Sequence, residues 1–591
     1  MARNKFDIDE NLESPFDINH FKRAMIYIRK QKNPMILAFT LSALSAAVGL
    51  SAPLIMQHIV DVVIPDKAVG ALVGWSALIL FTIVASVIMA TYRSRIMTRV
   101  GQDIIFDIRT DLFKHLQELP FQYYDDRPQG KILIRVVNYV NSVSDVLSNG
   151  IINFVLEIVN LLFIAIFMFM VNAKLSLLIL AGLPVFLALM ILIKNGQRRA
   201  WQAVSNKSSN VNAYLQESIS GIRVTQIFTR EQYNEGTFTR LAGNFRKAWM
   251  HAQLYNGFVP FAVDNLATIV STSIYLVGLL ILGPEEVTFG VIIAMTSYAA
   301  RFWQPILNLS NLYNSFINAV AYLERIFETL DEPVTVSDIP DALELPPIKG
   351  DVTFEDVTFA YEPGRNILEH LSFKVKAGES IALVGPTGAG KTTVVNLISR
   401  FYNITGGRIL VDGYDINQVT LKSLRSQMGI MLQDSFIFSG TILDNIRYGR
   451  LDATEEEVIA AAKAVRAHDF IQEFEMGYKT EVNERGSKLS QGQRQLISFA
   501  RTLLANPRIL ILDEATSSID AKTERLLQEG LNELLKGRTS FIIAHRLSTV
   551  KNCDRIMYVA DKGVAEAGSH DELIARRGLY YRLYSAQKME A

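Results

Sequence analysis

Cysteine is almost absent from this chain: Cys553 is the only one among 591 residues. A single cysteine cannot form a disulfide bond within the chain, and it cannot build a metal site made of several thiolates. A disulfide framework within the chain and a cysteine metal site are therefore excluded, and we expect Cys553 to be an ordinary packed thiol.

An excess of charge of either sign is absent as well, because 59 lysines and arginines balance 59 aspartates and glutamates. A neutral chain offers no overall charge that would attract nucleic acid, so we predict no nucleic-acid partner. The first 34 residues also lack the basic start, apolar core and small-residue cleavage site of a signal peptide. The length of the chain indicates more than one domain.

Long apolar runs, by contrast, are frequent in the first half of the chain. Six of them are long enough to cross a bilayer, since a spanning helix needs roughly 20 residues. We place these spans at 35–64, 68–92, 151–171, 175–193, 258–282 and 287–309. They predict an all-α transmembrane domain over residues 34–328.

The residues in front of the first span form a separate N-terminal segment, 1–33. Within it, residues 17–32 mix apolar and basic side chains at roughly helical spacing. This pattern is typical of an amphipathic helix that lies on the cytoplasmic membrane surface. An ordinary solvated helix end has the same pattern.

The connections between the spans differ in charge. The short ones, between spans one and two and between spans five and six, carry few basic residues, whereas the two long ones carry many. The positive-inside rule then places the long connections and both termini in the cytoplasm. Helical periodicity continues through the long connections, so we expect spans two to five to extend as helices beyond the bilayer.

Ionisable residues inside spans are rare and often functional. Glu157 in span three and Asp264 in span five are two such residues, which we expect near the outer ends of their spans. Either they line a substrate cavity, or they form hydrogen bonds between helices of the bundle. Trp303 in span six also has two interpretations, because it can face a central cavity or anchor the helix at the membrane interface.

The second half of the chain has a different pattern. Residues 329–350 contain four prolines among acidic residues, which indicates a linker. From residue 351 on, short alternating apolar segments predict strands, with a hairpin at 404–416. Longer segments between them predict helices at 421–427, 454–464, 491–505 and 523–535. We therefore predict an α/β nucleotide-binding domain over residues 351–591.

The strongest motif is a glycine-rich loop that follows the apolar run Ile381–Val384 and precedes a helical segment. Its residues are Gly385, Pro386, Thr387, Gly388, Ala389, Gly390, Lys391, Thr392 and Thr393. The order of strand, loop and helix is that of a phosphate-binding loop, in which backbone N–H groups surround the phosphates of a nucleotide. We expect Lys391 to reach the β- and γ-phosphates and the Thr392 hydroxyl to bind Mg²⁺.

Further candidate residues come directly after predicted strands. Asp513 follows a run that is apolar throughout, as expected for a strand buried on both faces, and is predicted to hold Mg²⁺. Glu514 is then placed to activate the attacking water as a general base. Gln433 and His545 end two other strands and are predicted to contact the γ-phosphate, with Gln433 also a candidate Mg²⁺ contact. A lone glutamine or histidine at a strand end is usually structural, but the combination with a complete phosphate loop favours catalysis.

These motifs and the six spans together resemble the ATP-binding cassette (ABC) family, and specifically exporter half-transporters that fuse a membrane domain to a nucleotide-binding domain. The most specific match is the signature motif, which comprises Leu489, Ser490, Gln491, Gly492 and Gln493. The resemblance implies that this motif caps an ATP bound to a partner domain, so that two ATPs lie between two domains of a dimer. A serine hydroxyl and a glycine N–H at a helix start suit a γ-phosphate.

The resemblance also implies roles for residues outside the signature. Tyr361 falls where the family stacks an aromatic ring on adenine, and Asp520 falls at the acidic position of the D-loop. The segments 481–486 and 217–222 resemble the regions through which exporters connect the nucleotide-binding domain to the tips of the membrane helices. ATP and Mg²⁺ are the cofactors that this family requires.

Two positions depart from the family pattern: Gln491 stands where glycine is commonest, and Leu496 stands where arginine is frequent. Such variation is similar to one half of heterodimeric bacterial exporters. A different half-transporter is therefore the favoured partner, and a homodimer is the alternative.

The resemblance implies ATP-driven export of hydrophobic or amphipathic compounds, of the multidrug type, across a bacterial cell membrane. The alternative is a lipid flippase or lipid exporter of the same architecture. The six predicted spans argue against a soluble ABC ATPase.

Overall fold

The computed structural model describes residues 18–127, 129–362, 364–431, 435–483, 486–513, 521–543 and 550–590. They form two compact units. The first comprises Met1–Leu116 and Gln129–Glu332, and the second comprises Gln117–Pro128 and Pro333–Ala591. The first unit is helical and the second is α/β, so the predicted fold class is confirmed.

Helices of very different length build the first unit. In chain order they are α1 (Ile18–Lys30), α2 (Lys32–Leu50), α3 (Ala52–His58), α4 (Val69–Glu118), α6 (Gln129–Ile134), α7 (Val140–Asp145), α8 (Ile151–Val171), α9 (Ala173–Ser220), α10 (Ile222–Ile227), α11 (Glu231–Leu276) and α12 (Phe289–Leu330). Short π-helical stretches continue several of them, at Ile59–Val63, Arg135–Tyr139, Val146–Gly150 and Val277–Leu282.

Five helical segments in the described part of the chain are long and apolar enough to cross a membrane. They are Lys32–Val63, Val69–Glu118, Ile132–Val171, Ala173–Ser220 and Glu231–Leu282. The sixth predicted span lies in α12, which is 42 residues long but is not among these five. Arg301 and Gln304 make this helix less apolar than the others, and its crossing of the membrane stays a prediction.

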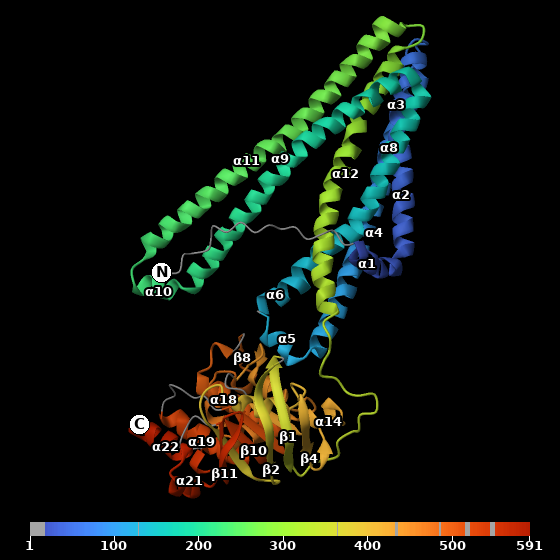
Figure 1. Cartoon of the computed structure of the whole chain (residues 1–591). Coiled ribbons are helices and arrows are strands. Elements are labelled where there is room, and N and C mark those ends of the chain that lie inside the picture. Colours follow the sequence, from blue (N-terminus) through green and yellow to red (C-terminus); the bar gives the residue numbers. More distant parts are fainter. Residues whose placement is uncertain are drawn as a thin grey trace. The chain divides into compact units, whose positions relative to one another are not determined.

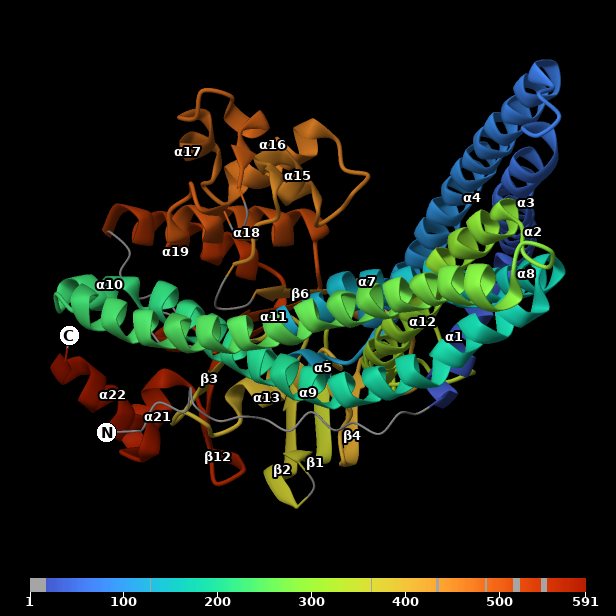
Figure 2. The same cartoon turned by 90° about the horizontal axis from the view of Figure 1, so that it is seen from above.

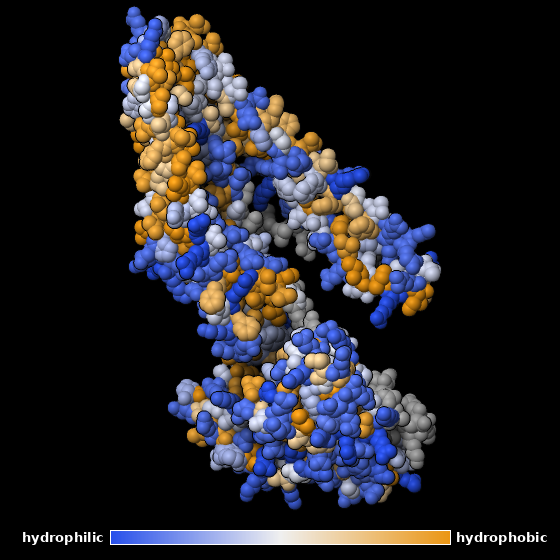
Figure 3. All heavy atoms as spheres, turned by 180° about the vertical axis from the view of Figure 1, so that it is seen from behind, coloured by the Kyte–Doolittle hydropathy of each residue, from blue (hydrophilic) through white to orange (hydrophobic). Residues whose placement is uncertain are grey.

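The surface of the first unit is unusually apolar for a protein in water. Large side chains on α4 are exposed, such as Leu80 at 63% and Phe81 at 67% of their surface. Figure 3 shows apolar surface along the helices of this unit. Contact with lipid tails removes such surface from water, whereas a monomeric soluble protein rarely exposes so much of it.

The helices α9 and α11 run side by side, with α10 at their common tip (Figure 1), and Figure 2 shows the same pairing from above. Trp201 of α9 packs edge-on against Trp249 of α11, with ring centroids 5.4 Å apart. At 1.5 Å per residue, the 48 residues of α9 extend over about 72 Å. The hydrocarbon core of a bilayer is roughly 30 Å thick, so the tip lies outside it.

The helix α1 is packed on the first unit rather than free in solvent. Arg23 donates two hydrogen bonds to Asp331, of 2.6 and 2.8 Å, and its guanidinium lies 4.2 Å from the ring centroid of Phe327. On the same helix Tyr27 donates to Asp111 at 3.0 Å. These contacts attach the predicted amphipathic helix to α4 and to the end of α12.

Two sheets form the centre of the second unit. The larger has the strand order β12-β11-β3-β10-β9-β6 and is parallel except for β12, and the smaller is antiparallel with the order β2-β1-β4-β5. The strands are β1 (Val352–Glu362), β2 (Arg365–Val375), β3 (Ser380–Val384), β4 (Gly406–Val411), β5 (Tyr414–Asp415), β6 (Met428–Met431), β7 (Gly440–Thr441), β8 (Glu481–Val482), β9 (Ile509–Asp513), β10 (Thr539–Ile543), β11 (Arg555–Ala560) and β12 (Gly563–Gly568). Of these, β7 and β8 belong to neither sheet and pair with each other in a separate two-stranded sheet.

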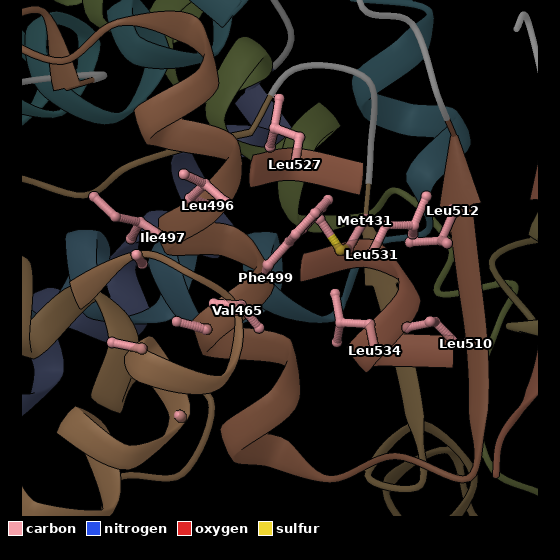
Figure 4. Close-up of a cluster of buried hydrophobic side chains, with 14 of the residues drawn as sticks. Met431, Val465, Leu496, Ile497, Phe499, Leu510, Leu512, Leu527, Leu531 and Leu534 are labelled. Carbon is pink, nitrogen blue, oxygen red and sulfur yellow. The ribbon is translucent and has the colours of Figure 1, made fainter. Parts of the chain in front are cut away.

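The helices of this unit pack on the sheets and on one another. They are α13 (Lys391–Ile398), α14 (Leu421–Arg425), α15 (Ile442–Arg447), α16 (Glu455–Ala464), α17 (His468–Gln472), α18 (Gln491–Ala505), α19 (Ala521–Leu535), α21 (His570–Arg576) and α22 (Leu579–Glu590). Leucine side chains of α18 and α19 meet those of β9 in a continuous apolar core (Figure 4). All four helices predicted in this half are present, with ends shifted by a few residues.

A short piece of the first long connection also belongs to the second unit. This segment, Gln117–Pro128, contains α5 (Phe121–Asp125), although the helices before and after it belong to the first unit. We call it the docked segment.

Candidate functional site

The glycine-rich loop joins β3, a central strand of the larger sheet, to α13. Gly385, Gly388 and Gly390 all have positive φ angles, of 139°, 82° and 100°. A Cβ atom on Gly385 would lie 2.2 Å from the carbonyl oxygen of Val559 in β11, so only glycine fits there. The conformation therefore depends on the glycines that the motif supplies, as expected for a loop that turns its N–H groups inward.

Lys391, the first residue of α13, is buried beneath this loop. Its ammonium donates to the carbonyl oxygens of Gly385 at 3.0 Å and Pro386 at 2.9 Å. Burial lowers the pKa of Lys391, and the nearby carboxylate of Asp513 partly opposes this effect. The side chain is thus a partly desolvated cation directly under the loop, which favours the approach of an anion.

Asp513 ends β9 at the same edge of the sheet. The strand β10 lies between β3 and β9, and its last residue Ile543 is aligned with Asp513. Because the carboxyl ends of parallel strands share one edge, the phosphate loop and Asp513 face the same crevice.

An Mg²⁺ site fits these residues. Thr392 is exposed near the start of α13 and offers a hydroxyl, and Asp513 offers a carboxylate. Mg²⁺ prefers such oxygen ligands and is commonly held by one or two protein groups together with substrate phosphates. In the part of the chain that the structure describes, no group of three histidine, cysteine or acidic side chains forms an independent metal site.

Tyr361 near the end of β1 lies beside the helix that follows the phosphate loop. Its hydroxyl is 3.1 Å from the Oγ1 of Thr393, which is buried in α13. Its ring packs against the rings of Phe359 and Tyr402. The predicted adenine contact is therefore held close to the predicted phosphate site.

The signature residues form the start of α18. Ser490 is the N-cap, and it accepts a hydrogen bond from the backbone N–H of Gln493 at 3.2 Å while its own N–H donates to the Gln493 side chain at 2.9 Å. Gly492 is buried and Gln491 is exposed. Leu496, one of the two departures from the family pattern, is buried in the core (Figure 4).

Four predicted residues lie outside the described residues. They are Gln433, Glu514, Asp520 and His545. Their proposed roles continue to rest on the sequence.

A cavity of about 360 Å³ lies in the first unit between α9, α11 and α12. It brings together Asp264 and Trp303, two of the three predicted cavity residues. Lys194, Gln197 and Asn311 line it as well. In the sequence, Lys194 is one of the many basic residues of the second long connection, and no periodic signal showed that it faces a cavity.

Glu157, the third predicted residue, is not among the residues that line this cavity. It accepts a hydrogen bond of 2.7 Å from Asn308 on α12, and Asn308 in turn accepts one of 3.2 Å from Gln304, which does line the cavity. For Glu157 the structure thus shows the helix–helix hydrogen bond that was the alternative interpretation.

The predicted depth of these acidic residues was wrong. Asp264 shares the cavity with Lys194, at the end of span four that leads into the long connection. Glu157 contacts Asn308 at the end of span six that leads to the linker. Both lie toward the ends predicted to be cytoplasmic, not toward the outer ends.

Trp303 is buried between aromatic rings. It is stacked on Phe186 with centroids 5.5 Å apart and is edge-on to Phe302 at 5.1 Å. Its indole N–H has no hydrogen-bond partner among the described residues, although only 2% of the residue is exposed. Such a buried donor at a cavity wall is a potential contact for a ligand oxygen.

Comparisons with known proteins agree with this arrangement. The family model described as the ABC transporter transmembrane region matches residues 35–306, and the model described as ABC transporter matches residues 368–517. A solved structure of a bacterial Atm1-family ABC exporter with ATP bound is similar, with a TM-score of 0.78 and 29% sequence identity over 94% of this chain and 98% of that one.

Three relatives differ in the cargo that their names state. A putative multidrug export ATP-binding/permease protein of Bacillus subtilis is 36% identical over 96% of this chain and 99% of its own length. A fatty acid ABC transporter ATP-binding/permease protein of Mycobacterium bovis is 38% identical over 89% of this chain and 83% of its own. An ATP-dependent lipid A-core flippase of Syntrophus aciditrophicus is 32% identical over the whole chain and 98% of its own length.

Proposed function

This chain belongs to the ABC transporter family as an exporter-type ATPase-coupled transporter, and we propose that it exports hydrophobic or amphipathic compounds by closing ATP between two half-transporters. The observation that carries the proposal is the crevice of the second unit, where a buried Lys391, a glycine loop and Asp513 converge. The same chain carries helices that can span a membrane, so nucleotide chemistry and a transmembrane path belong to one molecule.

The roles of the residues follow from their chemistry. The backbone N–H groups of the loop and Lys391 bind the phosphates, Thr392, Asp513 and Gln433 hold Mg²⁺, and Mg²⁺ supplies charge neutralisation on the phosphate oxygens. Glu514 orients and activates water as the general base. His545 contacts the γ-phosphate. Tyr361 stacks on adenine, which is consistent with its place beside α13.

The partner is a second half-transporter, and the exposed tip of the first unit supports this. Val224, Ile227 and Phe228 are 60%, 76% and 67% exposed at the tip formed by α10. This tip extends beyond the hydrocarbon core, so a protein surface rather than lipid must cover it. In the partner's ATP site we expect Ser490, Gln491, Gly492, Gln493 and the D-loop residue Asp520 to contribute.

The identity of that partner depends on two observations that differ in strength. Gln491 is exposed at the start of α18, where a phosphate would approach, so its departure from glycine favours a different chain as partner. Leu496 is part of the apolar core, and packing alone accounts for its replacing arginine. We keep the heterodimer as the proposal, and it now rests on Gln491.

The cargo site is the cavity that Asp264 and Trp303 line. It offers an acidic group, a basic group, amides and a buried aromatic wall, which suits an amphiphile with a polar head. Asp264 favours a cationic amphiphile of the multidrug type. The second candidate is an anionic lipid, and Lys194 is the observation that favours it.

ATP hydrolysis by the full-length chain in lipid nanodiscs tests the proposal. Glu514→Gln should abolish turnover, whereas the same change at Glu529, a partly exposed residue of α19, should leave it unchanged. Turnover that survives Glu514→Gln would contradict the assignment of the base. Turnover by the chain alone would show a competent homodimer, and its absence from folded protein that still binds ATP would support a different partner.

Stimulation of this ATPase by added amphiphiles tests the cargo. In Asp264→Asn we expect half-maximal stimulation by a cationic amphiphile to need about tenfold more compound, because a charge-assisted contact is lost. Asp66→Asn, at an exposed site between the first two spans, is the matched control. Loss of fatty-acid stimulation in Lys194→Gln, with no effect of Asp264→Asn on cationic compounds, would favour the lipid cargo instead.

The protein is a multi-pass membrane protein, and we propose that it lies in the bacterial cell membrane with both termini and the nucleotide-binding unit in the cytoplasm. The charge difference between the short and long connections supports this orientation. Labelling of single cysteines placed at 66 and 226 from either side of sealed vesicles, in a Cys553→Ser background, tests it.

A further inference from the structure

The docked segment is held on the second unit by two contacts to adjacent residues. The ring of Phe121 packs on that of Phe401, with centroids 5.0 Å apart and planes inclined by 31°. Four residues later, the carboxylate of Asp125 accepts a hydrogen bond from the hydroxyl of Tyr402. Both ends of α5 therefore contact one short stretch between α13 and β4.

That stretch is fixed by buried guanidinium groups. Arg400, only 3% exposed, donates to the carbonyl oxygens of Val419 at 3.1 Å and Ser337 at 2.8 Å. Arg425 donates to the carbonyl oxygen of Arg400 at 2.7 Å. Because backbone and side chain are both anchored, the residues that receive α5 move with the body of the unit rather than alone.

The other side of Tyr402 contacts the predicted nucleotide site. Its ring is perpendicular to that of Tyr361, with centroids 5.0 Å apart. The Tyr361 hydroxyl is 3.1 Å from Thr393 in the helix that follows the phosphate loop. Continuous contacts thus lead from Asp125 through Tyr402 and Tyr361 to α13.

The hydrogen bond at the outer end of this path is available at any physiological pH. Burial, and then the bond to Asp125, raise the pKa of the Tyr402 hydroxyl well above its ordinary value. Tyr402 therefore keeps its proton and remains a donor to the carboxylate.

We propose that Tyr402 is a positioning residue that links nucleotide binding at Tyr361 to the docked segment. A purine base stacked on Tyr361 restricts that ring, and the perpendicular ring of Tyr402 is restricted with it, so its hydroxyl stays directed at Asp125. This inference rests on the proposed function to the extent that Tyr361 contacts the base. It assigns the link between nucleotide binding and the docked segment to one tyrosine, and not to the docked segment as a whole.

Hydrogen exchange of the full-length protein in nanodiscs tests the link without requiring transport. With Mg²⁺ chelated to prevent hydrolysis, ATP should slow exchange of the amides in the docked segment by about fivefold, as expected for strengthening a single hydrogen bond to a charged group. Tyr402→Phe keeps the ring and loses the hydroxyl. It should bind ATP within about twofold of the wild type but lose the slowing, since the link to Asp125 is gone.

Tyr478→Phe is the matched control. It also removes a hydroxyl from a buried tyrosine of the same unit, one that lies 2.9 Å from the Nδ1 of His468 and contacts neither Tyr361 nor Asp125. We expect this variant to bind ATP and to slow exchange in the docked segment as the wild type does.

A second variant tests the inner contact. Tyr402→Leu removes the ring beside Tyr361 and should raise the Kd for ATP by about fivefold, the effect typical of losing an aromatic pair. In a Tyr361→Ala background the same change should raise it no further, because the two rings act through one contact.

Three results would overturn the inference: no slowing by ATP in the wild type, equal slowing in Tyr402→Phe and Tyr478→Phe, or additive effects on Kd in the double variant. ATP binding is measured in the same samples. A wild-type chain that fails to bind ATP would refute the proposed function and this inference together, whereas bound ATP without the predicted slowing would refute the inference alone.

Discussion

Replacing Arg501 with lysine should loosen the segment that follows Gln433. Arg501 lies on α18 and donates three hydrogen bonds: to the carbonyl oxygens of Asn445 at 2.8 Å and Phe436 at 3.0 Å, and to the Asn445 side chain at 3.0 Å. Burial lowers the pKa of this guanidinium, which shows how far it is withdrawn from water. The segment starting at Phe436 is thereby tied to α18.

The size of the effect follows from this geometry. Lysine keeps the charge but cannot form the planar fork of donors, so at least two of the three hydrogen bonds are lost and their buried acceptors are left unpaired. Each lost bond to a charged group costs roughly 1.5 kcal/mol, so local opening becomes easier by about 3 kcal/mol. At 1.4 kcal/mol per tenfold, this corresponds to roughly hundredfold faster exchange of the amides near Phe436.

Hydrogen exchange of the full-length variant measures this directly, with ATP turnover recorded on the same sample. Turnover should fall as well, because Gln433 lies three residues before Phe436. Arg466→Lys is the control, since Arg466 pairs with Glu529 at 3.1 Å on an exposed surface where ion pairs contribute little. Equal exchange near Phe436 in both variants would refute the reasoning.

Three further changes have definite expected outcomes. Gly385→Ala forces a methyl group onto a carbonyl oxygen of β11 at a φ of 139°, so ATP binding should weaken by roughly hundredfold in a titration, and wild-type affinity would contradict this account. Gly182→Ala places a Cβ 3.0 Å from the Trp303 ring and should weaken binding of a fluorescent amphiphile by about fivefold, whereas unchanged affinity would exclude this wall of the cavity. The hydrogen bond from Arg23 lowers the pKa of Asp331, so the contact is present above the ordinary carboxyl pKa of about 3.9 and is lost as the pH falls through the lowered value. Spin-label distances between α1 and α12 should therefore broaden only below about pH 4. In Arg23→Met, which lacks the contact, these distances should be broad at every pH.

Most of the second unit could be predicted from the sequence because its elements have strong local signals. The capping residues Ser490 and Thr454 mark two helix starts, and the apolar runs of β9 and β10 are uninterrupted. The strands β11 and β12 were not predicted, because β11 is a short mixed segment and β12 contains small and charged residues. Their pairing to the sheet is tertiary, and local pattern does not reveal it.

The cavity between α9, α11 and α12 and the docked segment were harder to derive for the same reason. Lys194 and Asp264 are about 70 positions apart in the sequence, and the side of a helix that faces a cavity has no periodic signal when lipid and protein are both apolar. Tyr402 follows α13 without any motif, and its contact to Asp125 joins residues 277 positions apart. The sequence suggested a role for Asp264 but none for Tyr402, and in both cases only the fold showed which residue lies beside it.

The phosphate loop and the signature helix are the two predicted halves of an ATP site. They differ in how many of their hydrogen bonds this chain forms by itself. Lys391 is a desolvated cation whose hydrogen bonds go to neutral carbonyl groups, so an arriving phosphate gives it a charged partner and restores its lowered pKa. Ser490 already caps the N–H of Gln493, and in the described structure no hydrogen bond uses the N–H of Gln491 or Gly492. Those two groups remain directed out of the helix start, where the helix dipole favours an anion. We therefore expect the phosphate loop to bind nucleotide within one chain, and we propose that the two N–H groups at the start of the signature helix bind a phosphate brought by a partner.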